Sequence, residues 1–399
     1  MKKLTLGFVA LFMNLFGAFA QTESNYDDRK LSIEEVNFVT SYYAQEGNNA
    51  AVTGGIGSEH LTDFANQLDL RLIKKDKKDR IHTIIASIGL DNYTSASSDK
   101  IDPTTISSAS SGDTRFYPKL GWTVNNEKTG WSYGAIASFS NEYDYTSFGI
   151  GLNVAKTSAD KNRELALNVQ AYFDTWTAIL PVELRPPGSM GKDGDDDNSA
   201  TQEPRNSISG SLTFSQVVNK RLQIAFMLDG IYQQGLLATR FHRVYLTDGT
   251  VRSENLPDNR LKIPIGVRAN YFLGNNIILR GYYRFYTDDW GLTAHTASIE
   301  VPIKINPYLS VSPNYRYYDQ SAVKYFAAYG QHTPSDQFYT SDYDLSKFNS
   351  HLIGTGIRWA PESGVFGVRQ FAVLELRYGH YIRSTGLTSD IITLGMKFK

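Results

Sequence analysis

The 399-residue sequence contains no cysteine. This absence excludes disulfide bonds, thiolate metal sites, cysteine nucleophiles and a lipid-modified cysteine behind a leader. The formal net charge is only −1 at pH 7, so nothing in the overall charge suggests a nucleic-acid partner. The fold must therefore be held together by non-covalent contacts alone.

Long apolar segments are also missing, apart from one at the N-terminus that is too short to span a bilayer. Residues 1–20 begin with two lysines, continue with an apolar stretch from Leu4 to Leu15 and end in Ala18-Phe19-Ala20. This pattern predicts a secretory signal peptide rather than a membrane anchor. Residues 21–33 follow as a polar N-terminal segment. An exported chain without cysteine is typical of a bacterial envelope protein that crosses an oxidising periplasm.

Tyrosine, in contrast, is abundant, with 25 residues, although the mean hydropathy is slightly negative. The apolar residues are dispersed at every second position instead of being clustered. In one segment, Phe148, Ile150, Leu152 and Val154 alternate with glycine and asparagine. Strict alternation predicts β-strands with one apolar and one polar face. Many aromatic residues in such a pattern are typical of strands that cross a membrane.

About sixteen segments of this kind, give or take two, follow one another along the chain. We expect strands near Val36, Leu68, His82, Phe116, Trp131, Phe148, Leu165, Ile208, Leu222, Leu261, Ile277, Ala297, Leu309, Leu352, Phe371 and Ile391. Short turns alternate with mostly long loops, which we expect at residues 45–63, 94–112, 181–205, 238–259 and 319–346. The sequence therefore predicts an all-β fold, a transmembrane antiparallel up-and-down β-barrel over residues 34–399 with short periplasmic turns and long extracellular loops.

The alternative is a soluble sandwich or solenoid, which would explain the alternation but neither the asymmetry of the connections nor the signal peptide. No sequence repeat supports a solenoid. One observation counts against a regular barrel: Pro118, Pro264, Pro302 and Pro313 fall inside strand-like segments, where each removes a hydrogen bond of the sheet. We expect these prolines at bulges or near the rims.

Two segments carry a resemblance to a known family. They are SYYAQEGNNAAVTGGIGSEHLTDFA, from Ser41 to Ala65, and DNYTSASSD, from Asp91 to Asp99. With the succession of strands, they resemble an uncharacterised family of Gram-negative outer-membrane β-barrels known only as a domain of unknown function. The resemblance covers the whole mature chain and is specific in the first hundred residues. It implies a location and a fold, but no activity and no functional residues.

The polar face of each strand would line the lumen of the barrel. In the second half of the chain this predicts a basic wall, with about eight net positive charges, and in the first half a mildly acidic one. In the second half, the expected lumen-facing basic residues are Lys262, Arg268, Arg280, Arg284, Lys304, Arg316, Arg358, Arg377, Arg383 and Lys397, against Glu300 and Glu375. In the first half, Asp69, Asp91, Asp174 and Asp229 are expected to face inward together with Arg71, Arg115 and Lys119. The resulting field would favour anionic solutes. Alternatively, these charges pair with each other and fill a closed interior.

Other chemistry is weakly indicated. Asp193, Asp195 and Asp197 alternate as the ligands of a calcium loop do, but the expected glycine and closing glutamate are absent, so a solvated acidic tip is the simpler interpretation. The seven histidines show no spacing of a catalytic or metal motif, and we expect no enzyme activity and no cofactor.

The C-terminal IITLGMKFK keeps the alternation of a strand to the end of the chain. We expect this strand to close the barrel against the one near Val36 and to carry the signal read by the outer-membrane assembly machinery. The functional hypothesis is a porin-like barrel of the bacterial outer membrane, in contact with its lipid, for passive passage of small polar or anionic solutes. The alternative is a non-conducting scaffold that binds an envelope or surface partner through its long extracellular loops.

Overall fold

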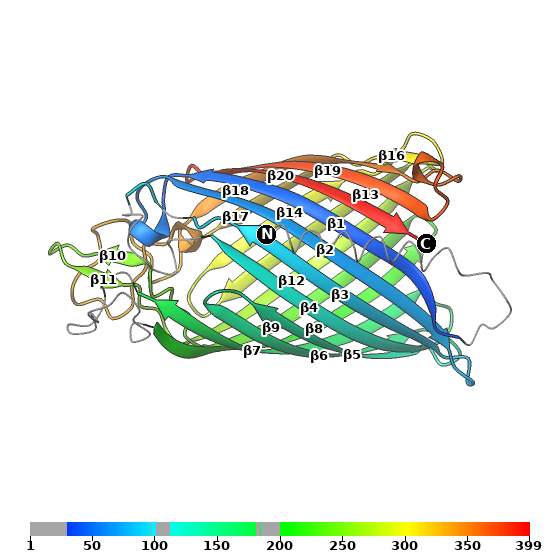
Figure 1. The fold of residues 1–399 in the computed structure, drawn as a ribbon, viewed down its shortest axis with the longest axis horizontal. Helices are drawn as coiled ribbons and strands as arrows, with labels where there is room; N and C mark the ends of the chain where they lie inside the picture. Colours follow the sequence, from blue (N-terminus) through cyan, green and yellow to red (C-terminus); the bar gives the residue numbers. More distant parts are fainter. Residues whose placement is uncertain (1–29, 97, 101–111, 181–183, 185–199) are drawn as a thin grey trace.

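The computed structural model describes residues 30–96, 98–100, 112–180, 184 and 200–399. It is one closed β-barrel with irregular segments gathered at one end (Figure 1). The expected signal peptide and the three aspartates of the acidic tip lie outside the described residues. Among the residues that are described, no helix is both long enough and apolar enough to cross a membrane.

Eighteen strand segments form the barrel sheet. Two neighbouring strands are each interrupted once, between β14 and β15 and between β16 and β17, so the barrel has sixteen strands. The predicted antiparallel barrel is confirmed, and each of the sixteen expected positions lies in a different strand. The segments are β1 (Ser32–Gly47), β2 (Glu59–Lys75), β3 (Ile81–Tyr93), β4 (Asp113–Asn126), β5 (Trp131–Asn141), β6 (Tyr145–Thr157), β7 (Arg163–Ile179), β8 (Ala200–Asn219), β9 (Leu222–Gly235), β12 (Asn259–Leu273), β13 (Ile277–Asp288), β14 (Thr293–Glu300), β15 (Ile303–Lys304), β16 (Leu309–Val311), β17 (Asn314–Gln320), β18 (Phe348–Trp359), β19 (Phe371–Arg383) and β20 (Thr388–Phe398).

The outer surface of the barrel is apolar because the alternation of the sequence places large hydrophobic residues on one face of each strand. Leu120 and Leu152, for example, are 56% and 63% exposed. A continuous belt of such side chains would be strongly disfavoured in water, at roughly 25 cal/mol per Å² of apolar surface. A closed barrel leaves no strand edge unpaired, so the same belt is stable in lipid.

The last strand closes the barrel. β20 pairs with β1, and in this register Phe398 lies opposite Val36 and Lys397 opposite Asn37. The ring of Phe398 stacks on that of Phe371 in β19, with centroids 4.8 Å apart, and is only 4% exposed. The alternation at the C-terminus therefore reflects the pairing that turns an open sheet into a barrel.

The four prolines interrupt the sheet in two different ways. Pro118 and Pro264 pair normally with one neighbouring strand, but the ladder to the other neighbour, β5 or β9, is broken beside them. Pro302 and Pro313 fall at the breaks between β14 and β15 and between β16 and β17, on adjacent strands. The loss of one backbone donor per proline thus costs local pairing without opening the barrel.

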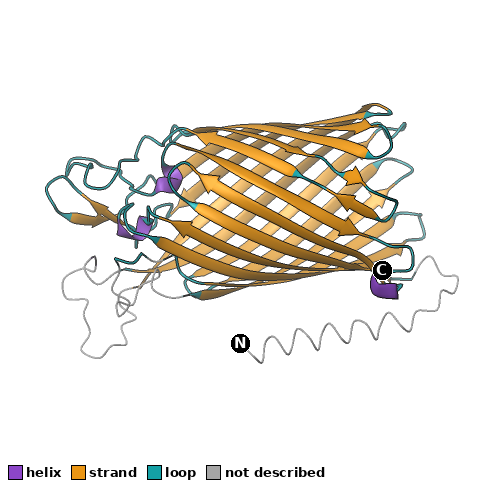
Figure 2. Cartoon of the chain, turned by 90° about the horizontal axis from the view of Figure 1, so that it is seen from above, coloured by secondary structure: helices purple, strands orange, loops and turns teal. Residues whose placement is uncertain are grey.

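The connections differ between the two ends of the barrel, as Figure 2 shows. At one end seven connections join the strands, most of them short; the longest, at residues 360–370, contains the 3₁₀ turn η5 (Val365–Gly367). At the other end, which we call the mouth, lie the long connections, with η1 (Ala51–Thr53), η4 (Tyr343–Leu345) and the hairpin of β10 (Arg243–Tyr245) and β11 (Val251–Ser253). The predicted asymmetry is therefore present.

Two loops at the mouth, residues 236–258 and 321–347, fold against each other into a cap. Backbone bridges join Leu246 to His332 and Asn255 to Tyr339. The cap shares an apolar core with the strand ends. Its buried members are Trp176, Leu236, Leu237, Ala238, Leu256, Trp290, Leu292, Ala294 and Val323. The hairpin of the first loop extends beyond the barrel end (Figure 1).

A buried ion pair joins β12 and β13 at the strand ends next to the cap. Arg260 Nη2 lies 2.5 Å from Asp288 Oδ2, and these side chains are only 12% and 0% exposed. Tyr286 Oη and the Leu292 N–H also donate to Asp288, and the Arg260 guanidinium lies 4.3 Å from the centroid of the Trp290 ring. The carboxylate of Asp288 thus accepts hydrogen bonds from three residues, Arg260, Tyr286 and Leu292, at the strand ends next to the cap.

We expect Asp288→Ala to lower the free energy of unfolding by about 3–5 kcal/mol, because it leaves the Arg260 guanidinium buried without a counter-charge. The measurement is denaturant unfolding of the refolded protein in detergent. Asp289→Ala is the matched control, since Asp289 is exposed. An equal loss in both variants would contradict the assigned role of the ion pair.

Candidate functional site in the barrel lumen and at its mouth

The basic residues of β12 to β20 occupy the strand positions between the outward apolar ones. In β13, for instance, Arg280 and Arg284 alternate with Tyr283, which belongs to the exposed outer surface. Arg268, Arg280, Arg316 and Arg358 are nevertheless exposed to solvent. A charged side chain that faces inward and is still exposed requires a water-accessible lumen.

A network of ion pairs crosses the inner side of this wall. Glu300 in β14 accepts from Arg280 in β13 at 3.1 Å and from Arg377 in β19 at 2.8 Å. Arg377 also lies 2.9 Å from Glu375. Two strands, β17 and β18, separate β14 from β19, so the contact between Glu300 and Arg377 can only pass through the concave side of the sheet. These charges therefore face the lumen together.

Other arginines of the same wall have no acidic partner. Arg268, Arg284, Arg316 and Arg358 form no ion pair with any residue within the described ranges. Arg268 lies 5.9 Å from the centroid of the Tyr282 ring. Lys304 is exposed near the end opposite the mouth, while Lys397 is paired with Glu35 at 2.5 Å. The wall thus keeps a positive charge that its own glutamates do not neutralise.

The acidic residues of the opposite half are held mainly by neutral donors. Tyr117 Oη donates to Asp91 at 2.8 Å and Tyr145 Oη to Asp174 at 2.5 Å. Ser211 Oγ donates to Asp229 at 2.5 Å, and Gln67 Nε2 to Asp69 at 2.8 Å. Hydrogen bonds from hydroxyl and amide groups orient these carboxylates and leave their negative charge in place. Carboxylates on β2, β3, β7 and β9 therefore add negative charge to the first half of the lumen.

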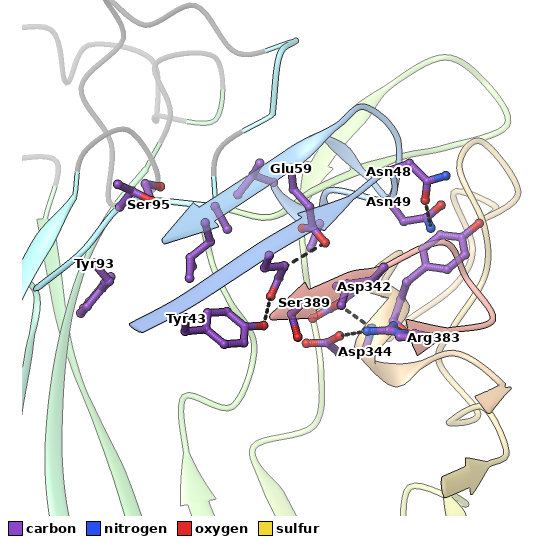
Figure 3. A pocket seen from close by; sticks show the side chains of 18 of the residues that line it. Tyr43, Asn48, Asn49, Glu59, Tyr93, Ser95, Asp342, Asp344, Arg383 and Ser389 are labelled. Carbon is purple, nitrogen blue, oxygen red and sulfur yellow. Dashed lines mark hydrogen bonds and ion pairs between the residues drawn. The ribbon is translucent and has the colours of Figure 1, made fainter. Parts of the chain in front are cut away.

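A cavity of about 610 Å³ lies at the mouth, between the strand ends and the cap. Figure 3 shows part of its lining, with Asp344 beside Arg383 and Glu59 on a neighbouring part of the wall. Arg383 Nη1 donates to Asp344 Oδ1 at 2.5 Å. Deeper in the barrel, a hollow of about 630 Å³ is lined by Arg268, Arg280, Arg316 and Arg377. Arg316 and Leu352 line both spaces, so the mouth cavity leads onto the basic wall.

His242 and Asp342, which line the mouth cavity, form a cluster of three potential metal ligands with the buried Glu254. His242 Nδ1 lies 3.8 Å from Glu254 Oε1 and 4.0 Å from Asp342 Oδ2, and it has no hydrogen-bond partner among the described residues. Burial alone would lower the pKa of His242, but the neighbouring carboxylates, Glu254 above all, raise it above its usual value. Burial, together with Asp344, raises the pKa of Asp342 to about 7.

This cluster could not be predicted from the sequence. Its members come from two loops of the cap, and their spacing matches no known motif. The lumen residues, in contrast, are accessible to sequence reasoning because strand alternation alone decides which face they occupy.

The fold and the lined lumen define a porin-like membrane-spanning β-barrel. Residues 81–369 match the family described as "Protein of unknown function (DUF3570)", and the chain belongs to this family. The predicted resemblance is thereby confirmed, although the match includes Asp91 to Asp99 and not Ser41 to Ala65. No curated protein matches the chain.

Several solved structures have a similar overall fold. A BenF-like porin from Pseudomonas fluorescens Pf-5 is 9% identical, with a TM-score of 0.41 over 92% of this chain and 98% of the porin. OpdQ from Pseudomonas aeruginosa is 8% identical, with a TM-score of 0.43 over 93% and 98%. A bacterial polysaccharide outer membrane secretin is 10% identical, with a TM-score of 0.44 over 91% and 98%. Values this low say nothing about solutes or partners.

Proposed function

We propose that the protein is a porin-like channel of the bacterial outer membrane through which small polar or anionic solutes pass passively. The observation that carries this proposal is the row of exposed arginines, Arg268, Arg280 and Arg316, on a path that begins at the mouth cavity. Wide barrels with a polar interior enclose water-filled channels, and their lining charges select the sign of the solute.

The arrangement of charges supports an anion preference. Unpaired guanidinium groups lower the electrostatic energy of an anion in the lumen, and each presents donors in a fixed plane to carboxylate or phosphate oxygens. The aspartates on the facing half are spread over β2, β3, β7 and β9 and are fewer than the basic residues opposite. A small anion would therefore be drawn toward β12 to β19.

Planar-bilayer recording of the refolded full chain tests the proposal. We expect the current to rise in steps as single channels insert. In a tenfold gradient of potassium chloride, the reversal potential should have the sign expected when chloride is more permeant than potassium. Heat-modifiable migration of the same sample on a gel shows that the barrel is folded. A folded sample without conductance, or one with cation preference, would overturn the anion channel.

A second function is favoured by the cap. Loops 236–258 and 321–347 share a core and present a folded surface at the mouth, as a scaffold for an envelope or surface partner would. Co-purification from mild detergent tests this alternative. A stable partner with no conductance favours the scaffold, and conductance from the protein alone favours the channel.

A further inference from the structure

The side chains of His242, Glu254 and Asp342 come together at spacings longer than those of hydrogen bonds. His242 Nδ1 is buried and makes no hydrogen bond with any described residue, a costly state for a polar atom. It faces carboxylate oxygens at 3.8 and 4.0 Å, well beyond the usual 2.7–3.2 Å of a hydrogen bond. Two ligands on opposite sides of one ion with bonds of about 2.1 Å are at most about 4.2 Å apart.

The two carboxylates are already oriented by other groups. Glu254 is 2% exposed, its Oε2 accepts from the Thr239 N–H, and its Oε1 accepts from Thr340 Oγ1. Asp342 accepts from the Asp344 N–H through Oδ1, which leaves Oδ2 directed toward His242. Such contacts to the ligand side chains are the usual means by which a protein fixes the geometry of a metal site.

The charges of the three side chains also favour the binding of a cation. Asp344 is paired with Arg383. Among the described residues, the cationic partner of Glu254 and of Asp342 is the imidazole of His242. Glu254 is buried and Asp342 is 22% exposed, so two carboxylates, one of them buried, face a single imidazole. A divalent cation would bring further positive charge to both carboxylates.

The chemical nature of the three ligand atoms indicates which class of metal ion would bind. One imidazole nitrogen with two carboxylate oxygens suits a divalent transition-metal ion of the zinc type, whereas calcium and magnesium prefer oxygen alone. His242 and Asp342 also line the mouth cavity, so further coordination positions would be open to water or a solute.

We propose that His242, Glu254 and Asp342 bind a divalent transition-metal ion such as Zn²⁺, which ties the two loops of the cap together at the mouth of the barrel. His242 and Glu254 belong to loop 236–258 and Asp342 to loop 321–347. One ion would therefore add a link between two loops that are already joined by apolar contacts, backbone bridges and side-chain hydrogen bonds such as that of Thr340 to Glu254.

Isothermal titration of the refolded full chain in detergent with zinc chloride tests the site. We expect one ion per chain, and an affinity at least tenfold lower in His242→Gln and in Asp342→Asn. His60→Gln and Asp248→Asn are the matched controls, because they remove an exposed imidazole and an exposed carboxylate, the latter within the same loop. Both should bind zinc as the unaltered protein does.

A second measurement separates loss of the site from loss of the fold. Zinc should slow proteolysis of the cap in the unaltered protein and not in the two ligand variants, while all samples keep heat-modifiable migration. The proposal is overturned if the folded protein binds no zinc, if both ligand variants bind it unchanged, or if binding depends on Asp195 in the acidic tip instead.

Discussion

Replacing Arg268 and Arg316 together by glutamate is expected to turn the proposed anion-preferring channel into a cation-preferring one. The double variant changes the charge of the basic wall by four units at two exposed positions that form no ion pair with the described residues. No partner is stranded, so we expect the barrel to fold. The permeability ratio of chloride to potassium should fall at least tenfold, which corresponds to about 1.4 kcal/mol.

Reversal potentials in a salt gradient measure this change. The reversal potential of the neutral variant, Arg268→Gln with Arg316→Gln, should lie between those of the unaltered protein and the glutamate variant. This variant removes the positive charges without adding negative ones. Lys77→Glu with Lys161→Glu is the control with the same change in total charge, placed in turns at the end opposite the mouth. Equal reversal potentials for the unaltered protein and the glutamate variant would show that these arginines do not determine selectivity.

Deleting Phe398 and Lys399 is expected to abolish most insertion into the outer membrane. Phe398 is the last residue of β20, stacks on Phe371 and lies opposite Val36 where the barrel closes. Removing a buried phenylalanine side chain costs about 3–5 kcal/mol by itself. Lys399 adds one backbone hydrogen bond to the Gln370 carbonyl, so deleting it alone should be nearly neutral.

Two assays distinguish assembly from stability. The amount of heat-modifiable protein in membranes reports assembly in cells, and refolding into detergent reports the stability of the finished barrel. If the C-terminus is a signal for the assembly machinery, the truncated protein will refold in detergent more completely than it inserts in cells. Equal efficiency in both assays, or normal insertion of the truncated chain, would refute the assembly signal.

The sequence predicted the barrel well because membrane strands obey a local rule. Whether a residue such as Arg280 faces lipid or lumen depends only on its position relative to neighbours like Tyr283, and turns of a few residues preserve the phase from strand to strand. The extent of the strands was harder to predict. β1 continues to Gly47 and β2 begins at Glu59, so both strands extend into residues 45–63, which were expected to form a loop.

No such local rule predicts the structure of the cap. Trp176, Leu236, Trp290 and Val323 come from four separate connections or strand ends, and their packing depends on contacts between residues far apart in the sequence. The same holds for His242 and Asp342, because no periodic pattern in the sequence indicates that these two loop residues lie close together. The seven histidines show no motif in the sequence, yet one of them, His242, lies in the proposed metal site.

The prolines that split two neighbouring strands make the barrel wall uneven. With its continuation in β15 and β16, the ladder between β14 and β17 has nine pairs, and that between β17 and β18, continued by β16, has ten, whereas β7 and β8 pair over seventeen residues. Fewer backbone pairs mean that less free energy opposes a transient local separation of two strands. The wall therefore resists separation less on the side that carries the basic residues than it does between β7 and β8.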